Sequence, residues 1–210
     1  CVDSGFDGIE LHGAHGYLIS QFLGSKTNLR IDAWGGSLQN RAKLLVEICN
    51  AIKANVPESF IIGVRISPEI DSLGINLNDS IQLVGILKKL NLDFIHISCW
   101  DVFARSKQNP GDKRTLTQII TDSHSNLPAI ISTGNVWSSK DANNLLNQGA
   151  DLVGVGRVGI AHPNWGKNIG DINYNPTPPP YTSDYLKHVK LSDKFIDYMR
   201  NWNGFVADSE

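Results

Sequence analysis

The segment 60–98 reads FIIGVRISPEIDSLGINLNDSIQLVGILKKLNLDFIHIS and predicts one complete strand–helix–strand unit. Its two ends, Phe60–Ile66 and Asp93–Ser98, are short and mostly apolar, as is typical of parallel strands covered on both faces. Between them, Asp79–Leu90 repeats apolar residues at helical spacing, with Asp79 near the start of the helix. Two strands joined through a helix in this way indicate a parallel sheet.

The same alternation of strand and helix continues on both sides of this unit. Three more strands are predicted at Gly8–Leu11, Ala129–Ser132 and Leu152–Val155. Three more helices are predicted at Leu38–Asn55 with Ser37 as N-cap, at Thr115–Ser125, and at Ser138–Gln148 before Gly149. A closed (β/α)8 barrel needs eight strands over about 250 residues. We therefore expect an α/β chain that forms only part of a TIM barrel, from about the fourth strand to the eighth.

The alternation stops after Pro163. Residues 175–180 read NPTPPP, which is typical of a stiff, extended connector, and Ser192–Trp202 predicts a short helical tail. We expect residues 1–170 to be the C-terminal part of the barrel. Residues 171–210 are then a proline-rich connector and a helical tail packed on the barrel, not a second domain.

The composition is that of an ordinary soluble globular protein, with 41% hydrophobic and 19% charged residues among 210. A formal net charge of −2 and the lack of a basic tract give no support to a nucleic-acid or membrane partner. No apolar run approaches the ~20 residues that would span a bilayer. Cys1, Cys49 and Cys99 lie far apart without a CxxC pair, which favours reduced thiols in the cytoplasm over disulfides or zinc. A homo-oligomer is compatible with all of this.

Polar residues follow each predicted strand at the end where the strand stops. His12 and His15 follow the first strand, and Arg65 closes the second. The fourth strand runs into STGN (132–135) and the fifth into GVGR (154–157). Because active sites of barrels gather at the C-terminal ends of their strands, we expect these residues to share one rim.

The last two of these loops predict a phosphate site. Gly134–Asn135 and Gly156–Arg157 follow consecutive strands, at the place where barrels commonly bind phosphate. Glycine permits close approach of the backbone, and the guanidinium of Arg157 can hold a phosphate through two hydrogen bonds. Either glycine pair alone is also compatible with an ordinary turn between helix and strand.

The opening stretch GFDGIELHGAHGYL (5–18) places His12, His15 and Tyr17 within six residues of one another. A metal site is disfavoured, because the two histidines lack the pattern HExxH and no third His or Cys lies close in sequence. Two imidazole N–H groups aimed at one carbonyl oxygen would instead stabilise the negative charge that develops there. Tyr17 could supply a proton as a general acid, or could simply pack on Phe22 at the start of a helix.

Arg65 stands at the end of an apolar strand, where an unpaired buried charge is costly. Two interpretations are open. Arg65 could form a structural salt bridge to a neighbouring acid, or it could stabilise negative charge on a bound, electron-rich ring.

Five motifs together resemble the C-terminal half of the old yellow enzyme family of flavin-dependent ene-reductases. They are HGAHGYL (12–18), NLRIDAWGGSLQNR (28–41), GVRIS (63–67), STGN (132–135) and LVGVGR (152–157). The resemblance covers essentially the whole chain. It implies a (β/α)8 barrel that binds FMN, takes electrons from NAD(P)H and reduces the C=C bond of an α,β-unsaturated carbonyl or nitro compound.

The resemblance also implies a role for each candidate residue. His12 and His15 would hold the substrate oxygen, and Tyr17 would protonate the α-carbon. Arg65 would lie against the N1/C2-carbonyl edge of the flavin. The phosphate of FMN would be bound by Gly134, Asn135, Gly156 and Arg157. An iron–sulfur subgroup of the family is disfavoured, because no Cys follows Cys99.

Two alternatives remain at this point. The chain could belong to another phosphate-binding barrel enzyme, such as an isomerase or a lyase. It could also lack catalysis of its own, because it begins at Cys1 without a Met and we expect the first three strand–helix units upstream. Without those units the sheet would expose unpaired edges and an open interior. We therefore expect residues 1–210 alone to bind FMN poorly.

Overall fold

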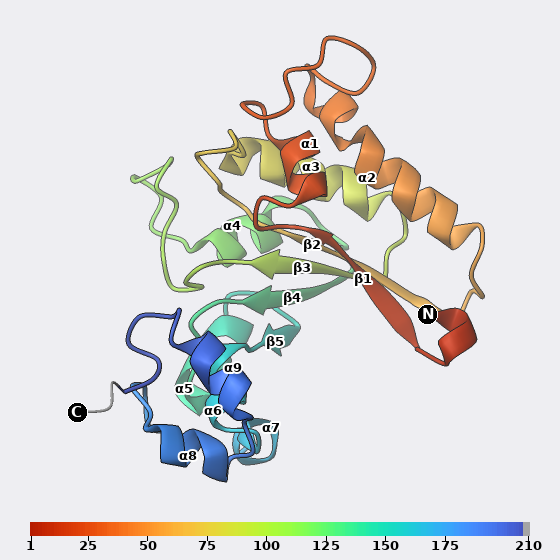
Figure 1. The fold of residues 1–210 in the computed structure, drawn as a ribbon. Coiled ribbons are helices and arrows are strands. Elements are labelled where there is room, and N and C mark those ends of the chain that lie inside the picture. Colours follow the sequence, from red (N-terminus) through yellow and green to blue (C-terminus); the bar gives the residue numbers. More distant parts are fainter. Residues whose placement is uncertain (208–210) are drawn as a thin grey trace. The chain divides into compact units, whose positions relative to one another are not determined.

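The computed structural model describes residues 1–207 and contains one five-stranded sheet in the order β1-β2-β3-β4-β5 (Figure 1). The strands are β1 (Gly8–Gly13), β2 (Ile61–Ile66), β3 (Phe94–Ser98), β4 (Ala129–Thr133) and β5 (Leu152–Gly154). The pairs β1–β2, β2–β3 and β3–β4 are parallel. All five predicted strands are confirmed, with ends that differ by at most two residues. The prediction of an α/β chain with a parallel sheet is thus confirmed.

Five helices lie between these strands, and the side chains of Ser37, Asn76 and Thr115 cap the starts of three of them. They are α1 (Leu18–Leu23), α2 (Leu38–Lys53), α3 (Leu77–Lys88), α4 (Leu116–Ser123) and α5 (Ser139–Leu146), and a short 3-10 helix covers Val2–Ser4. Ser37 caps α2 as predicted, by accepting a hydrogen bond from the backbone N–H of Asn40. The start of α3 differs from the prediction. Asn76 caps that helix by accepting from the N–H of Asp79, so Asp79 lies inside the first turn.

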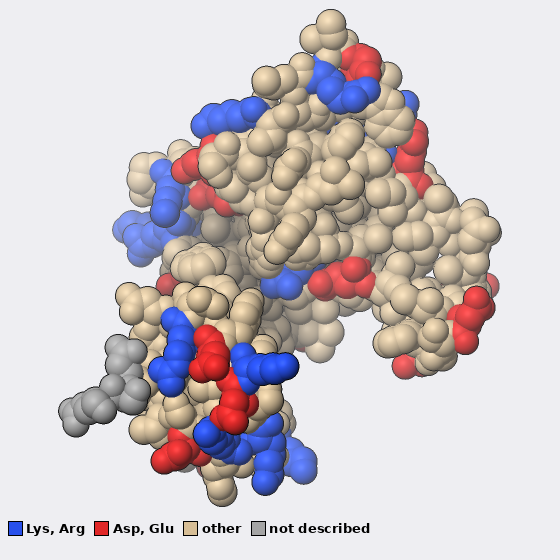
Figure 2. Space-filling model, in the orientation of Figure 1, with Lys and Arg blue, Asp and Glu red and all other residues tan. Residues whose placement is uncertain are grey.

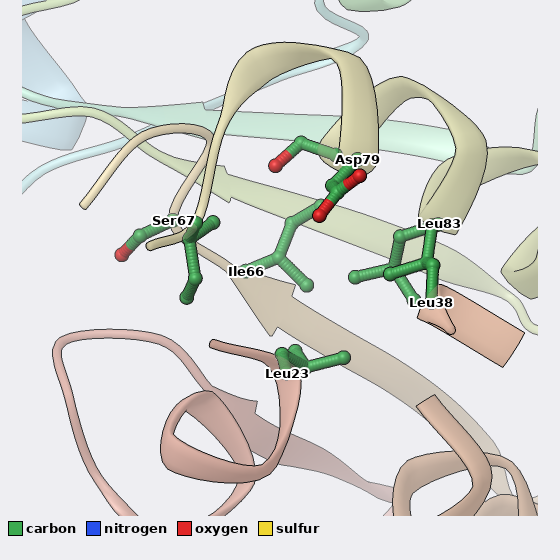
Figure 3. A pocket seen from close by; sticks show the side chains of 8 residues that line it. Leu23, Leu38, Ile66, Ser67, Asp79 and Leu83 are labelled. Atoms are coloured by element: carbon green, nitrogen blue, oxygen red, sulfur yellow. The ribbon is translucent and has the colours of Figure 1, made fainter. Parts of the chain in front are cut away.

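The two faces of the sheet differ sharply in chemistry. On one face, Ile66 packs against residues of α1, α2 and α3 around a small pocket (Figure 3). On the same face, Ser132 of β4 exchanges a hydrogen bond of 2.9 Å with Thr117 of α4. Helices α1 to α4 therefore cover this face, which bears the buried residues Ile62, Val64, Ile66, Ile95, Ile97 and Ile130.

Residues at the alternate positions point to the opposite face, and many of them are polar. Glu10 and His12 of β1, Arg65 of β2, and His96 and Ser98 of β3 share this face, because paired positions of parallel strands point the same way. The expectation of strands that are apolar on both faces is wrong for β1, β2 and β3. In their sequences, isolated polar residues alternate with the apolar ones, which is the signature of one apolar and one polar face.

A buried ion pair joins the helices on the covered face. The guanidinium of Arg41 in α2 donates to Asp79 of α3 at 2.8 Å, to the carbonyl of Gly36 at 3.0 Å and to the carbonyl of Leu23. Arg41 is almost fully buried, and Asp79 is largely buried. Asp79 also lines the pocket of Figure 3. The pair therefore fixes α1, α2 and α3 against the end of β2.

Replacing Arg41 with Ala is expected to lower the free energy of unfolding by about 3–5 kcal/mol, because it leaves the Asp79 carboxylate buried without a partner. Urea denaturation of the folded protein would measure the change. The double variant Arg41→Ala/Asp79→Ala should be less destabilised than the sum of the two single variants. A loss below about 1 kcal/mol for Arg41→Ala would show that the pair contributes little.

The chain divides into two compact units, each described by itself. The first contains residues 1–134 and 145–153, and therefore β1 to β4 and α1 to α4. Within the described residues, the second contains residues 135–144 and 154–207. Its helices are α6 (Arg157–Ala161), α7 (Trp165–Asn168), α8 (Ser183–His188) and α9 (Asp193–Met199). A small core of the second unit is built from Ala161, Tyr181, Leu186, Ile196, Met199, Phe205 and Val206.

The C-terminal region agrees in part with its prediction. Helix α9 confirms the helical tail, with Ser192 as its N-cap, and residues 175–180 form neither helix nor strand. Four short helices were not predicted from the sequence: α1, α6, α7 and α8. Each has only four to six residues, which is too short for a helical period to appear in the sequence.

The surface charges, the lengths of the apolar helices and the state of the cysteines can be compared with what the composition predicts. On the face shown in Figure 2, Lys and Arg side chains are interspersed with Asp and Glu side chains. None of the helices in residues 1–207 is both long and apolar enough to cross a membrane. Cys1, Cys49 and Cys99 are free thiols, and burial raises the pKa of Cys49 to about 11 and that of Cys99 to about 12.

Candidate active site

The end of β1 brings together the three side chains that the opening motif predicts. His12 lies in β1, His15 lies in the following turn, and Tyr17 is the N-cap residue of α1. The ring centroid of His12 is 5.0 Å from that of His15 and 5.2 Å from that of Tyr17. His15 and Gly16 both have positive φ angles, of 60° and 82°. A non-glycine residue in this conformation is uncommon and tends to occur at functional sites.

Tyr17 is exposed rather than packed in the core. Its side chain is 64% exposed, so a role restricted to packing on Phe22 does not account for its position. The phenol lies on the same side of the turn as the two imidazoles. Its hydroxyl is therefore free to act on a bound molecule.

Arg65 lies beside His12 in the sheet register and carries an unneutralised charge. Its Nη2 donates to Ser98 Oγ at 2.9 Å, and its buried Nε has no hydrogen-bond partner. Among residues 1–207, no Asp or Glu forms an ion pair with it. The salt-bridge interpretation is therefore wrong for the described residues. A partly buried guanidinium without a carboxylate favours the binding of an electron-rich ligand.

Ser98 connects Arg65 to His15, although the sequence pattern predicts only that Ser98 ends a strand. The Oγ of Ser98 lies 2.7 Å from His15 Nε2 and also accepts from Arg65. The backbone N–H of His15 donates to Ser67 Oγ at 3.2 Å. Two serines at the ends of β2 and β3 thus hold the turn that carries His15.

The electrostatics of the cluster keep His15 neutral at pH 7. Partial desolvation is the largest cause that lowers its pKa, followed by repulsion from the Arg65 guanidinium and then from the imidazoles of His12 and His96. His15 as a whole residue is nevertheless exposed. A neutral imidazole has one N–H donor and one acceptor nitrogen, so the contact with Ser98 decides which nitrogen faces a ligand.

Glu10 and His96 form a second pair of side chains on the same face, and the sequence-based prediction of the site did not include them. His96 Nδ1 lies 2.6 Å from Glu10 Oε2, and His96 is buried. Burial lowers the pKa of His96, and this effect outweighs the opposing effect of the Glu10 carboxylate. The sequence does contain a feature that could have indicated this pair: Glu10 and His96 each interrupt a short, mostly apolar strand.

The second unit brings together three of the four residues predicted to bind phosphate. Asn135 Oδ1 accepts hydrogen bonds from Arg157 Nη2 at 3.3 Å and from Trp137 Nε1 at 3.1 Å. The guanidinium carbon of Arg157 lies 5.8 Å from the centroid of the Trp137 ring. Gly156 precedes Arg157, and no atom lies within 4 Å of the position that a Cβ would occupy there. Trp137 is the residue that the sequence-based prediction missed.

Gly134, the fourth predicted residue, belongs to the first unit and has a structural reason to be glycine. Its φ angle is 148°, and a Cβ there would lie 2.3 Å from the carbonyl oxygen of Cys99. Close approach of two backbone segments therefore accounts for this glycine without a ligand.

The cluster in the first unit offers hydrogen-bond donors and one positive charge. Within residues 1–207, no group of three or more His, Cys, Asp or Glu side chains is arranged to hold a metal ion. What His12, His15, Tyr17 and Arg65 can do chemically is to bind an oxygen, stabilise negative charge and deliver a proton. In the second unit, Asn135 and Arg157 form a donor set that suits an anion.

Known proteins resemble this chain over most of its length. Residues 1–173 match the model of the NADH:flavin oxidoreductase / NADH oxidase family. The probable NADH-dependent flavin oxidoreductase YqiG of Bacillus subtilis is 36% identical over 169 residues, which are 78% of this chain and 45% of that protein. The 12-oxophytodienoate reductase 2 of Arabidopsis thaliana is 33% identical over 205 residues, which are 87% of this chain and 50% of that protein.

A solved structure extends the comparison to the fold. Morphinone reductase in complex with tetrahydroNAD superposes with a TM-score of 0.68 at 24% sequence identity, over 88% of this chain and 48% of that one. This chain spans about half the length of these three relatives. The match over residues 1–173 places the protein: the chain belongs to the NADH:flavin oxidoreductase / NADH oxidase family.

Proposed function

We propose that the protein containing this chain uses NAD(P)H and FMN to reduce a C=C bond that is conjugated to a carbonyl or nitro group. Membership of the family implies FMN as the cofactor and NAD(P)H as the reductant. The observation that supports the finer proposal is the cluster of His12, His15 and Tyr17 beside the unpaired Arg65. It combines donors for a carbonyl oxygen with a proton source, as reduction of an enone requires.

The residues present fit FMN. The buried Nε of Arg65 has no partner within the protein, and its charge suits the electron-rich edge of a flavin ring. In the second unit, Arg157 and Asn135 offer donors to a phosphate, and Gly156 leaves open space for its approach. When bound and reduced by NAD(P)H, FMN would supply the hydride for reduction of the C=C bond.

The protein's own residues would then act on the substrate. His12 and His15 donate hydrogen bonds to the oxygen of the carbonyl or nitro group, which stabilises the negative charge that develops there. Tyr17 delivers its phenolic proton to the α-carbon as a general acid. Arg65 keeps a positive charge beside the ring, and Ser98 fixes the orientation of both Arg65 and His15.

We also propose that the chain is the part of a (β/α)8 barrel from about the fourth strand to the eighth. A doubly wound sheet reverses its strand order and has helices on both faces. Here the order runs β1 to β5 without reversal, and α1 to α4 cover one face only. The polar face would then line the interior of the barrel. Residues 1–170 remain our proposed barrel segment, and residues 171–210 the proposed connector and tail.

Expressed alone, residues 1–210 are expected to bind FMN at least tenfold more weakly than the complete protein and to associate in solution. The physical reason is that no strand of residues 1–207 pairs with the outer edge of β1, and that further strands would complete the polar face in the proposed barrel. Quenching of FMN fluorescence and size-exclusion chromatography would measure both effects. A soluble, monomeric and yellow preparation of residues 1–210 would contradict this expectation.

The absorption spectrum of the purified complete protein tests the cofactor assignment. We expect bound FMN in a 1:1 ratio, bleached on anaerobic addition of NADPH or NADH. A colourless protein that takes up no FMN would contradict the proposal. It would favour an enzyme that uses the same loops to hold the phosphate of a substrate.

A further inference from the structure

Among residues 1–207, two buried side-chain polar atoms lack a hydrogen-bond partner, and both lie on the polar face of the sheet. They are Nε of Arg65 and Nε2 of His96. Arg65 and His96 are paired positions of β2 and β3, so their side chains leave the sheet side by side. Unsatisfied buried groups are rare in folded proteins, and two at neighbouring positions need an explanation.

Glu10 is the acidic residue that could neutralise Arg65. It lies in β1 opposite Gly63, on the same face as Arg65, which is two residues further along β2. Gly63 has no side chain of its own, and the ring of Phe94 from β3 fills the space where its Cβ would lie. The Glu10 carboxylate extends across β2 and lies 2.6 Å from His96 Nδ1, whereas the Arg65 guanidinium has no carboxylate partner within residues 1–207. His96 neighbours both groups, because it is hydrogen-bonded to Glu10 and is the strand partner of Arg65.

The hydrogen bond fixes the protonation pattern of His96. A carboxylate can only accept, so Nδ1 of His96 carries the proton that is donated to Glu10. Burial favours the neutral imidazole, which leaves Nε2 as an unprotonated acceptor without a partner. A neutral donor holds the carboxylate in place and leaves the positive charge of Arg65 uncompensated.

We infer that His96 is a positioning residue that holds Glu10 away from Arg65 and thereby keeps the guanidinium free for an electron-rich ring. This inference rests on the proposed function, because the ring is that of FMN. Without this hydrogen bond the carboxylate of Glu10, whose side chain is 30% exposed, would be free to turn toward the positive charge of Arg65 on the same face of the sheet. His96 would thus influence the reduction potential of the flavin without contacting it.

Loss of the Nδ1 donor is expected to release Glu10 toward Arg65. The neutralised guanidinium would no longer favour the anionic, reduced form of the ring. We expect His96→Leu to lower the equilibrium constant for two-electron reduction of bound FMN about tenfold, which corresponds to a potential about 30 mV more negative. The dissociation constant of reduced FMN should rise by a similar factor.

The experiment compares the FMN-loaded complete protein with four variants, one of which is Glu10→Gln alone, by dye-linked redox titration and by FMN binding. His96→Leu removes the donor, and His96→Asn keeps an amide N–H that can reach the Glu10 carboxylate. His96→Leu/Glu10→Gln removes the donor and the charge together. If His96→Leu does not fold, His96→Phe takes its place, because it also lacks the donor and keeps an aromatic ring.

We expect a more negative potential for His96→Leu only. His96→Asn should keep the potential of the parent protein, and the double variant should return to the potential of Glu10→Gln alone. A potential and FMN affinity of His96→Leu equal to those of the parent would overturn the inference. So would a shift that persists in the double variant, because His96 would then act without Glu10. Failure of the parent protein to bind FMN would instead contradict the proposed function.

Discussion

Replacing Tyr17 with Phe is expected to slow alkene reduction by about 10²–10⁴-fold, because the substitution removes the general acid and leaves the ring in place. The side chain is 64% exposed and its ring centroid lies 5.2 Å from that of His12, so the loss of the hydroxyl should not disturb the fold. Reduction of the flavin by NAD(P)H needs no proton from Tyr17 and should keep its rate. Stopped-flow measurement of the two half-reactions separates the effects.

Tyr198 provides a matched control. It is 54% exposed on α9 and lies in no predicted site, so Tyr198→Phe should leave both half-reactions unchanged. Equal rates of alkene reduction in the parent protein and in Tyr17→Phe would remove Tyr17 from the mechanism. Equal slowing of both half-reactions would point to a damaged flavin site instead of a missing acid.

Replacing His15 with Ala is expected to lower kcat/KM for an enone by about 10²–10³-fold, which is the typical cost of losing one preorganised donor to a developing oxyanion. Desolvation, together with repulsion from Arg65, lowers the pKa of His15, and the neutral imidazole still has one N–H to donate. Steady-state kinetics with 2-cyclohexenone would measure the loss. His12→Ala should show a loss of the same order.

Two variants sharpen this test. His15→Asn keeps an amide donor at the same turn and should lose less activity than His15→Ala. His188 is exposed at the end of α8, and His188→Ala should leave the kinetics unchanged. If His15→Ala and His188→Ala reduce 2-cyclohexenone equally fast, the proposed contact between His15 and the substrate oxygen is wrong.

The sequence predicted the sheet because its strands and long helices have clear periods. Asp79–Leu90 shows helical spacing over three turns, and the structure has α3 at Leu77–Lys88. The true start depends on Asn76, whose side chain caps the helix only because its backbone is extended there. Helices of four to six residues, such as α7, leave no period to detect.

The candidate site was predictable where one local motif places it. His12, His15 and Tyr17 lie within six residues, so a single turn determines that they meet. Contacts between strands were not predictable in the same way. Glu10 and His96 are 86 residues apart, and their hydrogen bond depends on the register of three strands. Ser98 joins Arg65 to His15 for the same reason, and no local pattern contains that register.

We propose that the polar face of the sheet serves the reduction of a conjugated C=C bond. Anaerobic titration of the NADPH-reduced complete protein with 2-cyclohexenone is the decisive experiment. We expect the oxidised flavin spectrum to return in proportion to the enone added and cyclohexanone to form in equal amount. A flavin that NADPH reduces but that neither 2-cyclohexenone nor a nitroalkene reoxidises would contradict it.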